Sequence, residues 1–187
     1  FGKTEIAMRA TFTALYNNKS VLVLSPTTIL TQQLFECFDK RLSPFGYVCY
    51  AVSRLTKNPN KQIESFLKAP SSVLIGTHSI AKKTDLLKRA GLFIVDEEHR
   101  FGVKDKEFVF NVNPAIDYLS MSATPIPRSL QFSLSNIRDI SVMLSPPVSR
   151  KAIITNILQY DFGVLQNIIF KEIYRGGQVF IVDNSID

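Results

Sequence analysis

No apolar run in this sequence approaches the roughly 18 residues that a membrane-spanning helix requires, and no secretory signal peptide is recognisable. The chain has two cysteines, Cys37 and Cys49, without a C-x-x-C spacing, and its two histidines are His78 and His99. Two cysteines and two histidines at these positions exclude a disulfide framework and do not match the usual zinc-ligand patterns. We therefore expect a soluble cytoplasmic protein with reduced thiols and no membrane partner.

Acidic residues are scarce relative to basic ones. The chain carries 22 lysines and arginines against 16 aspartates and glutamates, which gives a net charge of +6. From residue 150 onward the two signs balance, so the whole excess lies in the earlier part of the chain. A polyanion such as nucleic acid would bind there. A basic balance is also common in proteins that never bind DNA, so composition alone leaves the partner open.

Short β-branched apolar runs alternate along the chain with longer segments of helical periodicity. Runs that are apolar throughout are typical of strands buried on both faces, which indicates an α/β fold with a parallel sheet. The expected strands are 21–24, 47–52, 73–75, 92–95 and 116–121.

Two helices are expected before and between the first of these strands. The first begins directly after Lys3, with an apolar face formed by Ile6, Ala10 and Ala14. The second has apolar residues at positions 30, 34, 38 and 42, and Thr27 or Thr28 is placed to cap it.

Pro146-Pro147 interrupts this alternation and predicts a domain boundary. We expect a first domain over residues 1–147 and the beginning of a second over 148–187. The second should contain a strand at 152–157, a helix at 163–174 and a strand at 178–182. Because about 40 residues rarely bury enough surface to fold alone, we expect this second domain to be truncated.

Gly2-Lys3-Thr4 matches the end of a phosphate-binding loop, whose first turn would precede Phe1. Such a lysine reaches the β- and γ-phosphates, and the threonine hydroxyl holds Mg²⁺. Asp96 and Glu97 follow an apolar strand, where a carboxylate can hold Mg²⁺ through water or orient the attacking water. Taken separately, the first motif also fits an ordinary helix start and the second a solvated loop. Their combination favours a nucleotide site.

Three polar residues near this site can be interpreted either as functional groups or as residues with a purely structural role. His99 is next to the carboxylates, and we interpret it as a coupling group, although neighbouring carboxylates could simply satisfy it. Ser122 and Thr124 carry hydroxyls that could exchange hydrogen bonds when phosphate leaves. They also suit a turn ahead of two prolines.

Polar residues follow three more of the expected strands. Because parallel strands end at the same edge of a sheet, we expect these residues to lie along one edge. Hydroxyls, helix N-terminal amides and an arginine at such positions suit contacts to a phosphate backbone. Each also fits an N-cap or a turn. The candidates for DNA binding are Thr27, Thr28, Arg54, Thr77 and His78.

The motifs resemble those of superfamily 2 helicases, numbered I, Ia, Ic, II and III. More narrowly, the chain resembles the motors of bacterial transcription-repair coupling factors, with RecG-type fork-remodelling helicases as nearest relatives. Phe1, Glu98 and residues 137–139 favour the coupling factors. The matching segments are residues 1–5, 26–28, 76–78, 96–103 and 122–128.

This resemblance implies a RecA-like first lobe, truncated at its N-terminus, and the start of a second RecA-like lobe. It also implies ATP and Mg²⁺ as cofactors, double-stranded DNA as the track, and RNA polymerase and excision-repair proteins as partners reached through domains absent here. A RecG-type helicase and a non-catalytic nucleic-acid-binding domain remain alternatives. With part of the phosphate loop absent, we expect the isolated chain not to hydrolyse ATP.

The resemblance also assigns residues to roles. Nucleotide binding falls to Gly2, Lys3, Thr4 and Glu5, with Thr4 and Asp96 on Mg²⁺. Catalysis falls to Lys3, Asp96, Glu97 and His99. Coupling of hydrolysis to movement falls to Ser122, Thr124 and Arg128.

Overall fold

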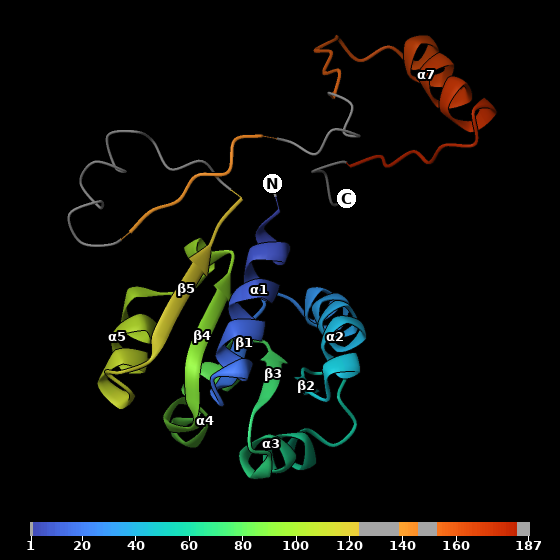
Figure 1. The fold of residues 1–187 in the computed structure, drawn as a ribbon. Helices are drawn as coiled ribbons and strands as arrows, with labels where there is room; N and C mark the ends of the chain where they lie inside the picture. The colour runs from blue at the N-terminus through green and yellow to red at the C-terminus, as the bar shows by residue number, and fades with distance from the viewer. Residues whose placement is uncertain (1, 124–138, 146–152, 183–187) are drawn as a thin grey trace. The chain divides into compact units, whose positions relative to one another are not determined.

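The computed structural model describes residues 2–123, 139–145 and 153–182. The chain divides into two compact units, Phe1–Pro146 and Pro147–Asp187. The first contains a sheet with helices around it, and the described part of the second contains one helix (Figure 1).

The first unit is built on five parallel strands in the order β2-β3-β1-β4-β5. The central strand β1 is buried along its whole length, as the apolar run at residues 21–24 requires. This arrangement confirms the predicted parallel α/β sheet, and each observed strand overlaps its predicted range. The strands are β1 (Ser20–Leu24), β2 (Val48–Val52), β3 (Ser72–Gly76), β4 (Ala90–Asp96) and β5 (Asp117–Met121).

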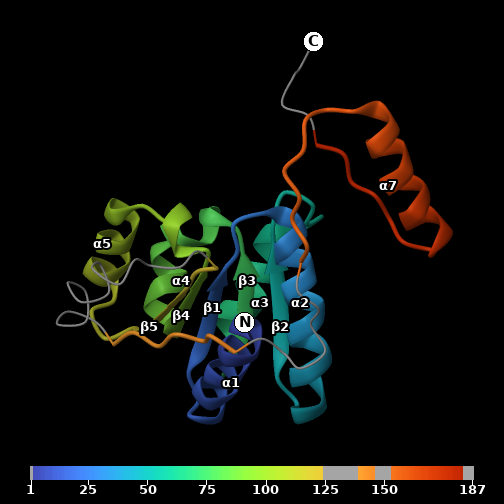
Figure 2. The same ribbon diagram turned by 90° about the horizontal axis from the view of Figure 1, so that it is seen from above.

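Helices cover both faces of the sheet and give it two apolar cores (Figure 2). Side chains alternate along a strand, so Val21 and Val23 pack with α1 and α2, whereas Leu22 and Leu24 pack with α3, α4 and α5. The helices are α1 (Lys3–Tyr16), α2 (Thr28–Leu42), α3 (Pro59–Lys68), α4 (Thr84–Arg89) and α5 (Val103–Val112), with short 3₁₀ turns at Ser43–Phe45, His78–Lys82 and Glu98–Arg100.

The cap of α2 agrees with one of the two predicted alternatives. Thr27 is the N-cap, and its Oγ1 accepts a hydrogen bond from the backbone N–H of Leu30 at 3.2 Å. The predicted apolar face of this helix is only half right, because Phe38 and Leu42 are buried while Leu30 is exposed. The sheet covers only the C-terminal part of that stripe.

The predicted apolar face of α1 is wrong in part. Ile6 is 45% exposed, and the buried face is formed by Ala7, Thr11 and Ala14 together with Met8 and Leu15. Helix α1 carries apolar residues on adjacent stripes, so periodicity alone did not indicate which stripe meets the sheet.

The second unit contains α7 (Phe162–Tyr174) in its described part, as predicted. Asp161 caps this helix by accepting hydrogen bonds from the N–H groups of Gly163 and Val164. The strands predicted at 152–157 and 178–182 are wrong for the described residues 153–157 and 178–182, which form no strand. A strand needs a partner for its backbone hydrogen bonds, and the described part of this unit supplies only a helix.

Cys37 and Cys49 are free thiols, as predicted. Cys49 lies in the core shared with α1 and α2, where burial raises the pKa of its thiol to about 12. Over the described residues, no helix is long and apolar enough to cross a membrane.

Phe93 should be the most sensitive position in the core that faces α4 and α5. Its side chain is fully buried on β4, and its ring lies 5.9 Å from the rings of both Phe101 and Tyr118. We expect Phe93→Ala to lower the free energy of unfolding by about 3–5 kcal/mol, because the cavity adds to the lost transfer energy. Urea denaturation measures this loss.

Leu55→Ala is the matched control, because Leu55 is 75% exposed. It should change the free energy of unfolding by less than about 0.5 kcal/mol. A similar small loss for Phe93→Ala would contradict the described packing of β4.

Candidate nucleotide site and adjoining groove

Residues that lie far apart in the first unit's sequence meet at the carboxyl edge of the sheet. The Nζ of Lys3, in the first turn of α1, donates a hydrogen bond to Oε1 of Glu97 at 2.7 Å and lies 3.5 Å from Oδ1 of Asp96. The side chains of Lys3, Asp96 and Glu97 are 22%, 18% and 22% exposed. This partial shelter strengthens their electrostatic interaction while leaving the edge open to a ligand.

Gly2 starts α1 in a backbone conformation that suits glycine. Its φ is +74°, in the left-handed region, and it serves as the N-cap. A Cβ placed on Gly2 would come no closer than 3.9 Å to another group, Sδ of Met143, so conformation rather than space requires glycine here. The first backbone N–H groups of a helix lack carbonyl partners within it, and an anion site uses such groups.

Glu97 also adopts a left-handed backbone, with φ 55° and ψ 60°. For a residue with a Cβ this conformation costs roughly 1–2 kcal/mol. The backbone N–H of Glu97 donates to Oδ1 of Asp96 at 3.1 Å, which supports the turn. The sharp turn directs the Glu97 carboxylate toward Lys3, so strain is stored where the two carboxylates meet the lysine.

Three groups surround the Glu97 carboxylate. The hydrogen bond from Lys3 holds its pKa below the usual range; the backbone N–H of Ala123 and nearby His99 act in the same direction, and partial burial opposes them. Nδ1 of His99 lies 3.5 Å from Oε2 of Glu97. Glu97 is therefore ionised at neutral pH.

The segment after β5 reaches Glu97 through its backbone. The N–H of Ala123 donates to Oε2 of Glu97 at 3.4 Å. Sequence reasoning pointed to the hydroxyls of Ser122 and Thr124 on either side, and it missed Ala123 because a backbone donor leaves no signature in the sequence. Ser122 and Ala123 are the last described residues of this segment. Thr124 and Arg128 lie outside the described residues.

Glu5 and Thr4 occupy the first turn of α1 without contacting the carboxylates. Glu5 pairs with Arg41 of α2 and with Arg9 one turn along α1, and these hydrogen bonds lower the pKa of its carboxyl to about 2. Thr4 is exposed beside Lys3. The Glu5 contacts join α1 to α2.

A groove of about 700 Å³ lies along the same sheet edge, after β1, β2 and β3. It contains all five residues that the sequence indicated as DNA-binding candidates. Its lining also includes Lys83, together with Asn60 and Ser79, two residues that sequence reasoning did not single out. The predicted candidates in this groove are Thr27, Thr28, Arg54, Thr77 and His78.

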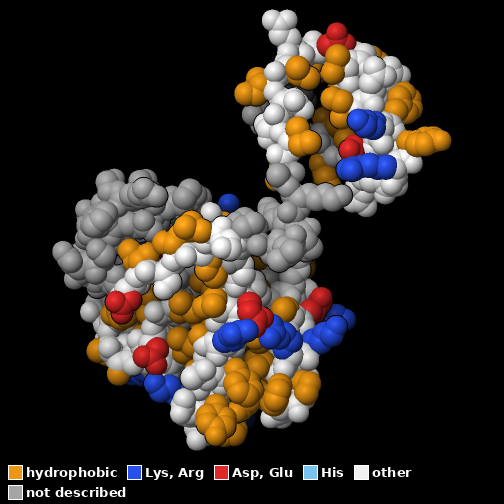
Figure 3. Space-filling view, turned by 45° about the horizontal axis from the view of Figure 1, so that its top comes forward, with side chains coloured by type: hydrophobic (Ala, Val, Ile, Leu, Met, Phe, Trp, Pro, Cys, Tyr) orange, Lys and Arg blue, Asp and Glu red, His pale blue; other side chains and the backbone are white. Residues whose placement is uncertain are grey.

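The face of the first unit shown in Figure 3 has acidic and basic side chains next to one another. Such mixing agrees with the pairs formed by Arg9, Arg41 and Lys19 with Glu5 and Asp117. The net positive charge of the chain therefore does not form one continuous patch on that face.

The sequence profile of the DEAD/DEAH box helicases matches residues 1–132. This chain belongs to that family. It is 44% identical over its whole length to the transcription-repair-coupling factor of Myxococcus xanthus and 41% identical to that of Escherichia coli, and it spans 16% of each. RecG bound to a three-way DNA junction is 28% identical, with a TM-score of 0.68 over 94% of this chain and 24% of RecG.

These likenesses confirm the RecA-like fold of the first unit. A second solved structure, the UvsW helicase of bacteriophage T4, shares the fold at 22% identity, with a TM-score of 0.51 over 66% of this chain and 43% of that one. The Asp96-Glu97-Glu98-His99 tetrapeptide lies within the part of the chain that the helicase profile matches.

Helicases of the DEAD/DEAH family act with a nucleotide and a divalent metal, and the residues present fit this pair. Among the described residues, no group of three His, Cys, Asp or Glu side chains could hold a metal by itself. Mg²⁺ usually binds one or two carboxylates together with substrate phosphates and water. Two carboxylates beside a lysine at a helix N-terminus are the residue types that such a site would need.

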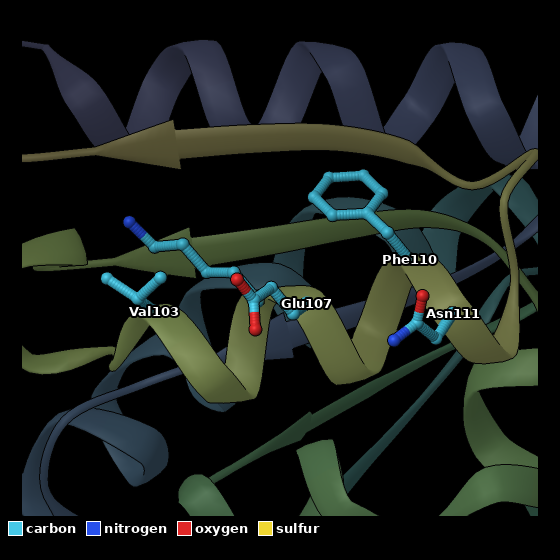
Figure 4. Close-up of a pocket in the computed structure, with 5 residues that line it drawn as sticks. Val103, Glu107, Phe110 and Asn111 are labelled. Carbon is cyan, nitrogen blue, oxygen red and sulfur yellow. The ribbon is translucent and has the colours of Figure 1, made fainter.

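A smaller hollow of about 390 Å³ lies along α5. Figure 4 shows Val103, Glu107, Phe110 and Asn111 spaced along this one helix. Lys106, which also lines the hollow, donates to Oε1 of Glu98 at 2.6 Å. Helix α5 thereby holds the turn that follows the site carboxylates.

The pairing of Glu5 predicts a pH-dependent contribution to stability. A carboxyl whose folded pKa is about 2 stabilises the fold above its ordinary pKa of 4.5, and the effect disappears as pH falls toward 2. The stability difference between the unsubstituted chain and Glu5→Gln should therefore be constant from pH 7 to about 5 and shrink below it. Urea unfolding at pH 7, 5, 4 and 3 measures it.

Glu64→Gln supplies the control, since Glu64 is an exposed carboxylate on α3 without an ion pair among the described residues. Its stability difference should not shrink in this way. If the Glu5→Gln difference stayed constant down to pH 3, the two arginines would not hold the Glu5 carboxylate ionised.

Proposed function

We propose that this chain contributes the first motor lobe of an ATP-driven translocase on double-stranded DNA, with residues 1–147 as that lobe and 148–187 as the beginning of the second. One observation carries this proposal: Lys3, Asp96 and Glu97 meet at the sheet edge that also bears the groove. A motor must couple nucleotide hydrolysis to a grip on its track. At a shared sheet edge, nucleotide hydrolysis and DNA binding would both take place on the loops that follow the strands.

The hydrolytic roles follow from the chemistry of each group. Lys3 would neutralise the β- and γ-phosphates, and the backbone N–H groups beside Gly2 would bind their oxygens. Asp96 and Thr4 would hold Mg²⁺, which when bound neutralises charge that develops on the phosphates. Glu97, kept ionised by its neighbours, would orient the attacking water and accept its proton.

The segment after β5 would report the state of the site. Ala123 already contacts Glu97, and Ser122, Thr124 and Arg128 belong to the same segment. His99, whose Nδ1 lies 3.5 Å from the same carboxylate oxygen, would help to orient the carboxylate. A change at the carboxylate therefore has a direct route into this segment. Glu5 would support the phosphate loop through its ties to α2.

The groove would hold a phosphate backbone rather than read bases. Hydroxyls from Thr27, Thr28 and Thr77, one guanidinium and one imidazole in its doubly protonated form are suitable donors for phosphate oxygens. Such contacts grip DNA of any sequence, as a translocase requires. Basic residues on the groove rim, among them Lys83, would add salt-dependent attraction.

The similarity to known proteins supports a proposal for what the full-length protein acts on. The similarity to transcription-repair-coupling factors supports displacement of stalled RNA polymerase and recruitment of excision-repair proteins in the cytoplasm, through parts of the protein outside this chain. RecG-type fork remodelling is the second candidate, favoured by the likeness to RecG on a DNA junction. A non-catalytic binding domain fits less well, because Lys3 and both carboxylates are present and in contact.

Glu97→Gln tests the motor in the full-length protein that carries this chain. An amide of the same shape cannot accept the proton of the attacking water, so ATP turnover should fall by about 10²–10⁴-fold. The affinity for Mg-ATP should stay within about threefold, because the phosphates are bound by other groups. Steady-state hydrolysis and nucleotide titration measure the two quantities.

Glu107→Gln makes the same chemical change on α5, outside the carboxylate pair, and should leave turnover near that of the unsubstituted protein. If Glu97→Gln hydrolysed ATP at the unsubstituted rate, Glu97 would not be the group that activates water.

A further inference from the structure

His78 occupies a position that no other residue of the groove shares. It lines the groove, and its Nε2 lies 3.0 Å from the backbone carbonyl oxygen of Arg100. A carbonyl oxygen only accepts, so Nε2 carries the hydrogen and donates it. In the described part of the chain, no other groove-lining side chain hydrogen-bonds to the turn that follows Glu97.

Arg100 belongs to the turn that fixes Glu97. The backbone N–H of Arg100 donates to the carbonyl of Glu97 at 2.9 Å, and that of Phe101 donates to Glu98 at 2.9 Å. Glu97 itself has the left-handed backbone that this turn holds in place. A displacement of the Arg100 carbonyl is therefore transmitted to Glu97 through a single turn of backbone.

Phe101 gives the turn a fixed point in the core. It is 4% exposed, and its ring lies 5.9 Å from the ring of Phe93 and 6.0 Å from that of His78. The His78 ring therefore makes two contacts with the turn, one by hydrogen bond and one by packing. Its Nδ1 makes no hydrogen bond within the described residues. In the doubly protonated ring Nδ1 also carries a hydrogen, which a phosphate oxygen in the groove can accept.

We propose that His78 is a positioning residue through which duplex DNA in the groove sets the orientation of Glu97 and so stimulates ATP turnover. This inference rests on the proposed function, because it requires DNA in the groove and hydrolysis at Glu97. DNA that fixes the His78 ring keeps Nε2 on the Arg100 carbonyl. The turn then holds the Glu97 carboxylate where it can orient water, and no conformational change of the sheet is needed.

The test separates DNA affinity from the rate at saturating DNA. In the full-length protein, ATP turnover is measured against duplex DNA concentration, and DNA affinity is measured separately by fluorescence anisotropy. His78→Phe keeps a ring against Phe101 and removes the N–H. It should lower the rate at saturating DNA by about tenfold or more, as loss of a well-oriented general base does, with DNA affinity changed by less than about threefold.

Two comparison variants identify the cause. His78→Gln restores an N–H donor near the Nε2 position and should recover most of the saturating rate. Arg54→Gln removes a groove side chain without a contact to the turn, so it should weaken DNA affinity and reach the unsubstituted rate at saturation. If His78→Phe does not fold, His78→Met against His78→Gln makes the same comparison of a chain without and with a donor.

The outcomes are distinct. An unsubstituted saturating rate in His78→Phe with weakened DNA binding would make His78 a simple DNA contact and overturn the inference. Equal losses in His78→Phe and His78→Gln would also overturn it, because the donor would not matter. Turnover in the unsubstituted protein that does not rise with duplex DNA would remove the proposed function itself.

Discussion

The ion pair between Lys3 and Glu97 is the interaction on which the site depends. It joins two residues that are 94 positions apart, and it forms because α1 begins, and β4 ends, at one edge of the sheet. The parallel arrangement of the sheet creates that edge, and the apolar sequences of its strands suit burial under helices on both faces. Any change that shifts β4 against β1 would separate the lysine from both carboxylates.

The conformational cost of the left-handed backbone at Glu97 is offset by local contacts. The left-handed backbone of Glu97 is supported by Asp96 within the turn, by Lys3 from α1 and by Ala123 from the segment after β5. Each of these contacts comes from a different element. A change in the position of any of these elements would therefore affect the Glu97 carboxylate. The groove joins this network through His78. Hydrolysis and grip are therefore adjacent in the fold rather than linked over a long path.

The sequence predicted those features that depend on local pattern. Continuous apolar runs predicted the strands, Thr27 was one of the two predicted caps, and two motifs far apart in the first unit's sequence indicated Lys3 and Glu97. It failed where the tertiary partner decides: the stripe of α1 that is buried, and the strands expected at 152–157 and 178–182, which have no pairing partner in their described residues. The contacts of Ala123 and of the Arg100 carbonyl were invisible because they use backbone atoms, which every residue carries.

The most direct test of the account is the release of stalled RNA polymerase from a DNA template by the full-length protein with ATP, with Glu97→Gln compared in parallel. The account predicts release by the unsubstituted protein and none by the variant, since the variant can bind nucleotide without using it. Equal release by both proteins would contradict the claim that hydrolysis at this sheet edge drives movement. Absence of release, with ATP-dependent remodelling of branched DNA, would instead assign the motor to the RecG type.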